Sequence, residues 1–272
     1  MDTIQLKNLC REIRKDIVRM IYEAGSGHPG GSLSCVELIA GVYFTQMNVD
    51  PKSPKDPERD RFVLSKGHCA PAYYAVLAHR GFFPVEDLFT LRKLHSNLQG
   101  HPDSKKTCGV DVATGSLGQG VSLAVGMALA AKHMNKGYKT YVVTGDGELQ
   151  EGQIWEAFMS AAHYKLDNLT ILIDWNGLQI DGTNDEVMSL GDLHMKLCAF
   201  GLDVIEVEDG NNIEELVCAL NRAMTKGKPK CILAHTTKGK GVSFMENQVG
   251  WHGKAPNKEQ VELALKELEL EA

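Results

Sequence analysis

The sequence lacks the cysteine patterns that mark a zinc site or a disulfide framework. Its seven cysteines stand singly along 272 residues, and no two of them form a C-x-x-C pair. An odd, scattered set with no secretory signal at the start is typical of a protein in a reducing compartment. We therefore expect a cytoplasmic protein whose core needs no disulfide.

Long apolar runs and a basic stripe are also missing. The longest apolar run, residues 121–131, is interrupted by Ser122 and Gly126, whereas a membrane span needs about 20 apolar residues. The formal net charge is −6 at pH 7, and no stripe of Lys and Arg stands out. These absences predict a soluble protein whose partners are neither nucleic acid nor membranes.

Two kinds of hydrophobic pattern are present. Apolar residues at helical spacing predict helices at 4–23, 34–46, 70–79 and 85–91, the second of which begins with a capping box from Ser34 to Glu37. After Gly120, helical segments alternate with apolar, β-branched runs at 141–144, 169–174, 203–207 and 231–235. This alternation predicts an α/β fold with a doubly wound, mainly parallel sheet. We expect residues 1–272 to form a single domain that ends in a charged helical tail at 257–272.

Two polar motifs follow predicted strands. G-D-G-E occupies residues 145–148, and D-W-N-G-L occupies residues 174–178. Because open parallel sheets bind ligands at the carboxyl ends of their strands, Asp146 and Asn176 can meet there. A carboxylate, an amide oxygen and a backbone carbonyl suit Mg²⁺, which completes its shell with phosphate oxygens, and Gly147 lets a phosphate approach the backbone. Singly, each motif can be a mere turn or loop cap; together they favour a metal–diphosphate site.

Five further motifs surround this pair. They are S-G-H-P-G-G-S at 26–32, S-K-G-H at 65–68, G-H-P-D at 100–103, G-S-L-G-Q-G at 115–120 and W-H-G at 251–253. With these motifs in this order, nearly the whole chain resembles the N-terminal domain of the transketolase family. G-D-G followed about thirty residues later by Asn is that family's signature for thiamine diphosphate (ThDP). The resemblance implies a ThDP-binding fold, and specifically its diphosphate-binding module.

The resemblance also implies roles for particular residues. Asp146, Asn176 and the carbonyl of Leu178 would ligate Mg²⁺, or Ca²⁺ in its place. Most family members have Pro where Ser116 stands here, so the turn at 115–117 is expected to be less rigid. The residues that would contact or flank the cofactor are His68, Gly115, Ser116, Leu117, Gly147, Glu148, Asn176 and His252.

Histidines are expected to supply the proton chemistry. A side chain with a pKa near 6.5 can donate or accept a proton at neutral pH, which suits a reaction among sugar hydroxyls. By the resemblance, His28, His101 and His252 would line the substrate channel as catalytic residues. His95 matches no motif. Lys238 and Lys240 either flank a phosphate or belong to a solvated loop. Structural roles are expected for His79, His133, His163, His194 and His235.

The activating half of a transketolase has no counterpart in these residues. Complete transketolases continue into a pyrimidine-binding domain with an activating acidic residue, and no acidic residue here matches it. We therefore predict the N-terminal subunit of a split transketolase, which transfers a two-carbon ketol unit from a ketose phosphate to an aldose acceptor. Its partner would be a separate C-terminal subunit, in a tetramer with two copies of each chain (α₂β₂).

Several alternatives remain open from the sequence. One is a subunit of another ThDP enzyme of the superfamily, either a 1-deoxysugar-phosphate synthase or a transketolase for an unusual sugar phosphate. A second is a non-catalytic assembly subunit that retains the fold. A third explanation for the missing half is that the sequence is a truncated piece of a longer product.

Overall fold

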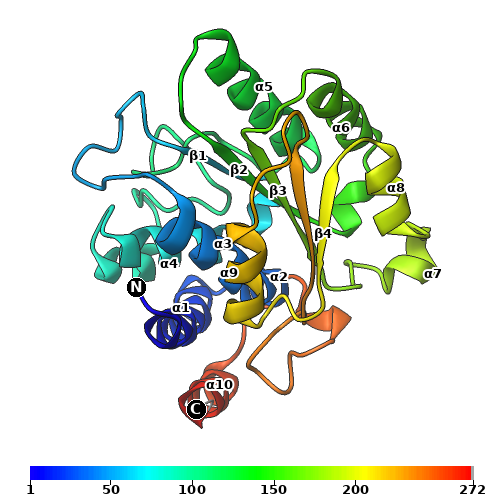
Figure 1. Cartoon of the computed structure of the whole chain (residues 1–272). Helices are drawn as coiled ribbons and strands as arrows, with labels where there is room; N and C mark the ends of the chain where they lie inside the picture. The colour runs from blue at the N-terminus through cyan, green and yellow to red at the C-terminus, as the bar shows by residue number, and fades with distance from the viewer. Residues whose placement is uncertain (271–272) are drawn as a thin grey trace.

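The computed structural model describes residues 1–270 and has a parallel sheet at its centre (Figure 1). The strand order is β1-β2-β3-β5-β4, and every neighbouring pair runs parallel. The predicted α/β fold with a parallel sheet is confirmed. The strands are β1 (Arg61–Leu64), β2 (Thr140–Gly145), β3 (Leu169–Trp175), β4 (Asp203–Val207) and β5 (Lys230–His235).

The hydrophobic pattern predicts four of these strands and misses β1. Its four residues, R-F-V-L, are too few to show either alternation or a long apolar run. β1 pairs with β2, and the N–H of Ser65 continues the ladder by donating to the carbonyl of Val143 at 2.8 Å. This pairing brings the S-K-G-H turn at 65–68 to the sheet edge where the G-D-G loop begins.

Helices cover both faces of the sheet (Figure 1). Tyr141 and Val143 of β2 face one core, whereas Val142 between them faces the other. The strands are thus buried on both sides, which confirms the doubly wound arrangement. On one face lie α1 (Thr3–Ala24), α2 (Pro29–Ser34), α3 (Val36–Gly41), α4 (Ala70–Arg80) and α9 (Ile213–Asn221). On the other lie α5 (Gln119–His133), α6 (Gly152–His163) and α8 (Leu193–Ala199).

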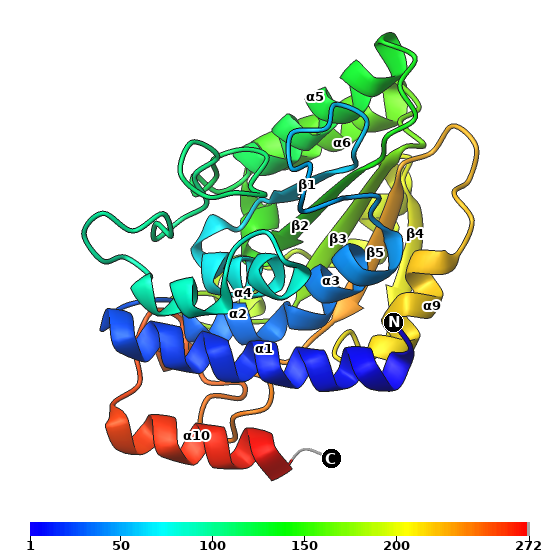
Figure 2. The same ribbon diagram turned by 90° about the vertical axis from the view of Figure 1, so that its left-hand side faces the viewer.

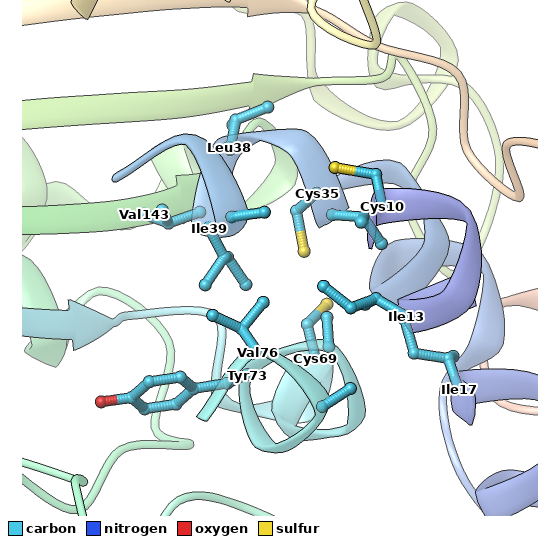
Figure 3. Close-up of a cluster of buried hydrophobic side chains, with 14 of the residues drawn as sticks. Cys10, Ile13, Ile17, Cys35, Leu38, Ile39, Cys69, Tyr73, Val76 and Val143 are labelled. Carbon is cyan, nitrogen blue, oxygen red and sulfur yellow. The ribbon is translucent and has the colours of Figure 1, made fainter. Parts of the chain in front are cut away.

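The first core includes a cluster where α1, α3 and α4 meet beside β2 (Figure 3). Ile13, Ile39 and Val76, one from each helix, have no exposed surface. Fully burying a side chain of this size stabilises a protein by about 1.5–3 kcal/mol. This packing gives the loops at 26–34 and 65–69 a rigid support. All seven cysteines, within the residues that the structure describes, are free thiols.

The predicted capping box at Ser34 is wrong, and so is the single helix from 34 to 46. α2 ends at Ser34, α3 starts at Val36, and a π-helical turn (Val42–Gln46) follows. The Ser34 hydroxyl donates to Asp174 at 2.6 Å instead of capping a helix. The Glu37 carboxylate accepts two hydrogen bonds from Arg14, at 2.7 and 2.6 Å. Tertiary partners have taken both side chains away from the local motif.

The chain returns at its end to the first helix. α10 (Lys258–Leu270) lies along α1 (Figure 2), and the Lys15 ammonium binds Glu269 at 2.6 Å. The last two residues of the predicted tail, 271–272, lie outside the described residues. No helix within residues 1–270 is long and apolar enough to cross a bilayer. The shorter elements are α7 (Asn184–Met188) and 3₁₀ turns at Gly67–Cys69, Val85–Thr90, Gly147–Gln150 and Val249–Trp251.

Candidate active site

The two polar motifs meet at the carboxyl edge of the sheet. In the register of β2 and β3, Gly145 lies opposite Asp174, so the loops that follow begin side by side. The N–H of Gly177 donates to Asp146 Oδ2 at 2.5 Å, which joins one loop directly to the other. Gly177 has a positive φ of 76°, a conformation that glycine adopts without strain. The juxtaposition predicted from the strand ends is therefore present.

The predicted metal ligands form an oxygen-rich group. Asp146 is buried, and its pKa is raised to about 6 by burial and by the nearby Asp174 carboxylate, against the lowering effect of Asn184 and two backbone N–H groups. Asn176 Oδ1 accepts from the N–H of Leu178 at 3.2 Å. The described residues hold no group of three or more His, Cys, Asp or Glu side chains placed for a metal. A metal here would need the amide and carbonyl oxygens as well, and such a set suits a hard divalent cation; ligation itself stays a prediction.

Four histidines converge beside this group. The His28 ring lies 5.2 Å from His68, 6.3 Å from His101 and 5.6 Å from His252, measured between ring centroids. Burial is the main cause that lowers the pKa of His28 to about 4, that of His252 to about 3, and that of His101 in the same direction. These three rings are therefore neutral at pH 7. The sequence predicts all four, and the structure brings them together.

Lys238 is a site residue that sequence reasoning left undecided. Its side chain is only 2% exposed, and its Nζ lies 3.1 Å from the Leu178 carbonyl oxygen and 3.2 Å from His252 Nδ1. The solvated-loop alternative is wrong for this residue. Lys240, by contrast, is partly exposed and pairs loosely with Glu246 at 3.8 Å. A buried ammonium beside the oxygen-rich group of Asp146, Asn176 and the Leu178 carbonyl is well placed to bind an anion.

A cavity of about 410 Å³ opens beside these groups, and of the four histidines His68 and His252 are in its lining. Among the predicted cofactor contacts, His68, Leu117, Gly147, Glu148, Asn176 and His252 line it, together with Lys66 and Lys238. Gly115 and Ser116 lie in the adjoining turn. A Cβ at Gly67 would come 2.8 Å from the Gly115 nitrogen, and one at Gly115 would come 2.9 Å from the His101 ring. Close backbone approach at these glycines holds the turn against the histidines.

Glu148 lines the cavity but its carboxylate is already fully engaged. It accepts from the Ser65 hydroxyl at 2.5 Å, the Thr144 hydroxyl at 2.7 Å, and the N–H groups of Gly118 and Gly145 at 2.8 and 3.1 Å. These bonds fasten the 115–118 turn to the ends of β1 and β2. The observed role of Glu148 is to hold the wall of the cavity, and a direct cofactor contact stays a prediction.

The residues present fit a diphosphate with a divalent cation. Gly147 leaves room at the start of a 3₁₀ turn, where a Cβ would come 3.1 Å from Gln179 Cβ. Among the described residues, buried His28 Nδ1 and both side-chain polar atoms of Asn184 make no hydrogen bond of ordinary geometry. Lys238 supplies positive charge for phosphate oxygens, while Asp146 and its neighbours supply oxygens for a cation.

Comparisons with known proteins show the family of this chain. Residues 5–272 match the family model described as "Transketolase, thiamine diphosphate binding domain", and the chain belongs to the transketolase family. It is 46% identical to a subunit of the apulose-4-phosphate transketolase of Phocaeicola vulgatus, over 98% of this chain and 94% of that protein. It is also 46% identical to the SqwG subunit of the 6-deoxy-6-sulfo-D-fructose transketolase of a Clostridium species, over 98% of both chains. The predicted family, with its split-subunit type, is confirmed.

Single-chain transketolases are longer. The chain is 43% identical to human transketolase over 97% of its own length, which is 42% of that protein. Its structure superimposes on the transketolase of Leishmania mexicana with a TM-score of 0.93, at 34% identity, over 97% of this chain and 41% of that one. The chain thus spans about two fifths of these enzymes. Its relatives of similar length are each named as one subunit of a transketolase, which implies a separate partner subunit.

Proposed function

We propose that this chain is the diphosphate- and metal-binding subunit of a two-subunit transketolase. With a partner that carries the pyrimidine-binding domain, it transfers a two-carbon ketol unit from a ketose phosphate to an aldose acceptor. The observation that carries the proposal is the joining of Asp146, Asn176 and the Leu178 carbonyl to Lys238 and a histidine cluster at one cavity.

We assign the groups that line the cavity to two ligands, a cation and an anion. Asp146, Asn176 Oδ1 and the Leu178 carbonyl would hold Mg²⁺ or Ca²⁺, and Lys238, His68 and the Gly147 backbone would hold the diphosphate. When bound, ThDP supplies the nucleophilic carbon and the electron sink for cleavage of the ketose. The protein's own contribution is to hold this group rigidly, through loops fixed at the ends of β1, β2 and β3.

The histidines would hold the sugar. Because the pKa values of His28 and His252 lie at about 4 and 3, both rings are neutral at pH 7 and each offers one donor and one acceptor nitrogen. His28 Nδ1 is buried and makes no hydrogen bond to the described residues. Because that atom is buried, a substrate hydroxyl or carbonyl oxygen would meet the ring's other nitrogen, Nε2, and a proton could pass between the hydroxyl and the ring.

A partner chain is part of the proposal because the cavity has an exposed apolar rim. Leu117, Ile180 and Met188 are 37%, 61% and 62% exposed, and the first two line the cavity directly. A covering domain would bury these side chains and exclude water from the reacting groups. We propose an α₂β₂ assembly in which each site is completed by the partner chain.

The substrate we propose is an unusual sugar phosphate. One relative of similar length is named for apulose-4-phosphate, a sugar phosphate, and this name supports the proposal. Another is named for 6-deoxy-6-sulfo-D-fructose, an unusual sugar that carries a sulfo group instead of a phosphate. A 1-deoxysugar-phosphate synthase is less favoured because these relatives, like the longer human enzyme, carry the name transketolase. A non-catalytic assembly role is disfavoured by the intact Asp146, Asn176 and Lys238, which such a role does not require.

The test is calorimetric titration of ThDP into the chain and its partner subunit, with and without Mg²⁺. We expect tight binding only when Mg²⁺ is present, and we expect Asp146→Ala to abolish it. Unchanged ThDP affinity in this variant would rule out the metal assignment. Absence of ketol transfer by the wild-type complex, despite normal ThDP binding, would instead favour the assembly role.

A further inference from the structure

Asp174 is a buried carboxylate directly behind the candidate metal site, and the proposed chemistry gives it no role. It lies in β3, two residues before Asn176, and has no exposed surface. Its Oδ2 accepts from Ser34 Oγ at 2.6 Å, from Asn176 Nδ2 at 3.1 Å and from the Lys66 ammonium, and its Oδ1 accepts from the Thr236 hydroxyl. Four donors from four separate segments therefore converge on one side chain.

The contact with Asn176 has a consequence for that residue's orientation. An ionised carboxylate can only accept hydrogen bonds, so it must face the NH₂ group of the amide and not the amide oxygen. With Nδ2 turned to Asp174, Oδ1 is turned to the opposite side, where it accepts from the Leu178 N–H. A flipped amide would place two acceptors against each other and would withdraw Oδ1 from the metal group.

Lys66 pairs with this carboxylate in the interior. The Lys66 ammonium is only 2% exposed and, besides Asp174, donates to the Gly31 carbonyl at 3.1 Å. A buried carboxylate without such a partner would be strongly disfavoured. The ion pair and the three other donors thus hold this carboxylate in place as an acceptor.

From these contacts we propose that Asp174 is a positioning residue for the metal site: its carboxylate fixes the Asn176 amide with Oδ1 available to the metal. This inference rests on the proposed function, because it assigns the metal to Asp146, Asn176 and Leu178. Asp174 itself is not one of the proposed metal ligands, and it does not line the cavity. It acts through the polarity of a single hydrogen bond.

Reversing that polarity tests the proposal. Asn176→Asp alone sets two carboxylates against each other, so we expect at least a tenfold rise in the Mg²⁺ concentration that gives half-maximal ThDP binding. In the double variant Asp174→Asn with Asn176→Asp, the new amide donates to the new carboxylate, which again has one oxygen free for the metal. We expect the double variant to recover most of the loss.

A merely structural role for Asp174 gives the opposite order, because the double variant would then carry two defects and bind Mg²⁺ more weakly than Asn176→Asp. Either that order, or wild-type Mg²⁺ dependence in Asn176→Asp, would overturn the proposal. Calorimetry of ThDP binding at a series of Mg²⁺ concentrations measures the effect without any assay of activity. Wild-type protein that fails to bind ThDP with Mg²⁺ would refute the proposed function instead.

Thr236→Val is the matched control. It removes one hydrogen bond to Oδ1 of Asp174 but leaves Lys66 and the Asn176 contact in place. We expect a lower Tm with a Mg²⁺ midpoint within twofold of wild type. If Thr236→Val shifts the midpoint as far as Asn176→Asp does, general loosening of the network is the cause and the proposal is wrong. Neither Thr236→Val nor Asn176→Asp removes the Lys66 ion pair. The Mg²⁺ midpoints of these two variants can therefore be compared even if the double variant with Asp174→Asn does not fold.

Discussion

At the scale of single residues, Asp146 destabilises the fold that carries it. Burial and the Asp174 carboxylate raise its pKa from 3.8 to about 6, which corresponds to roughly 3 kcal/mol at neutral pH. The folded state binds the proton more tightly than the unfolded state does. The stability contributed by the protonated Asp146 carboxyl is therefore lost as the pH rises from about 4 to about 6. Above that range the buried carboxylate is ionised and unfavourable.

Asp146→Asn should accordingly stabilise the protein in the absence of Mg²⁺. At pH 8 we expect the free energy of unfolding to rise by about 1–3 kcal/mol, because a buried charge is removed while the side-chain shape is kept. Near pH 4, where the wild-type carboxyl is protonated, the difference should disappear. Urea unfolding followed by circular dichroism at both pH values measures it. A less stable variant at pH 8 would mean that the hydrogen bonds to Gly147 and Gly177 outweigh the cost of burial.

Lys238 should control affinity for the diphosphate. Lys238→Met keeps the length of the side chain and removes its charge, so we expect ThDP to bind about 10–100-fold more weakly, in line with a lost charge-assisted hydrogen bond of about 1.5–3 kcal/mol. Calorimetric titration in saturating Mg²⁺ measures the change. Lys240→Met is the control, because that side chain is partly exposed and only loosely paired. Equal losses in both variants would point to a general effect of positive charge.

Sequence motifs predicted those site residues that belong to a short contiguous motif. They did not predict residues whose burial depends on packing between distant segments. G-D-G and the following Asn could be assigned because the strand ends place them together. Lys238 could not, since a lysine beside a glycine looks like a solvated loop. Its burial arises from Gly30, where a Cβ would come 3.0 Å from the Trp251 carbonyl and 3.1 Å from Lys238 Cγ. That contact joins segments more than 200 residues apart in sequence.

At the scale of elements, a buried ion pair joins α1 to α3. Glu37 accepts two hydrogen bonds from Arg14 and a third from Asn211 Nδ2 at 2.9 Å. Glu37→Ala leaves the Arg14 charge buried without this carboxylate, so we expect a loss of about 3–5 kcal/mol in unfolding free energy. Glu58→Ala, which breaks an exposed pair with Lys136, should cost less than about 1 kcal/mol. Chemical unfolding of both variants checks this; similar losses would contradict the assignment.

The same ion pair explains which elements could be predicted. The long helix α1 follows its apolar spacing closely, with a predicted range of 4–23 and an observed range of Thr3–Ala24. The helix predicted from 34 to 46 fails because Ser34 and Glu37 are recruited by Asp174 and Arg14, which are far away in sequence. Local patterns therefore predict a long helix with a continuous apolar stripe, even where polar side chains such as Arg14 have tertiary partners. They fail where such partners take the side chains that would cap the helix.

At the scale of the whole molecule, activity should require a second chain. The purified chain alone should show no ketol transfer, because none of its acidic residues matches the activating carboxylate, and mixing with the partner chain should restore it. A coupled assay with a ketose phosphate donor measures the rate, and sedimentation of the mixture measures the stoichiometry, for which we expect two copies of each chain. Full activity of the single chain would refute the split arrangement.

The order of the motifs predicted the family and showed that the chain matches its N-terminal part, since five motifs stand around G-D-G in the order that the family has. The sugar that the enzyme uses could not be predicted in the same way. In the arrangement that we propose, donor and acceptor chemistry would depend on groups that reach the cavity from the partner chain, whereas His28, His101 and His252 would contact parts that many sugars share. The motifs of this chain therefore predict the part of the site that the family shares, and they do not predict which sugar is the substrate.

The position of α10 has a consequence for how the molecule opens. This helix is anchored mainly to α1, through the buried side chains of Val261, Ala264 and Leu268 and the pair between Lys15 and Glu269. Because this interface is small, we expect α10 to detach independently. The free energy of that local opening should lie well below the free energy of global unfolding. Amide hydrogens of α10 should therefore exchange with deuterated solvent long before those of β2 and β3. A protease that samples such brief openings would trim this end first and leave the site intact.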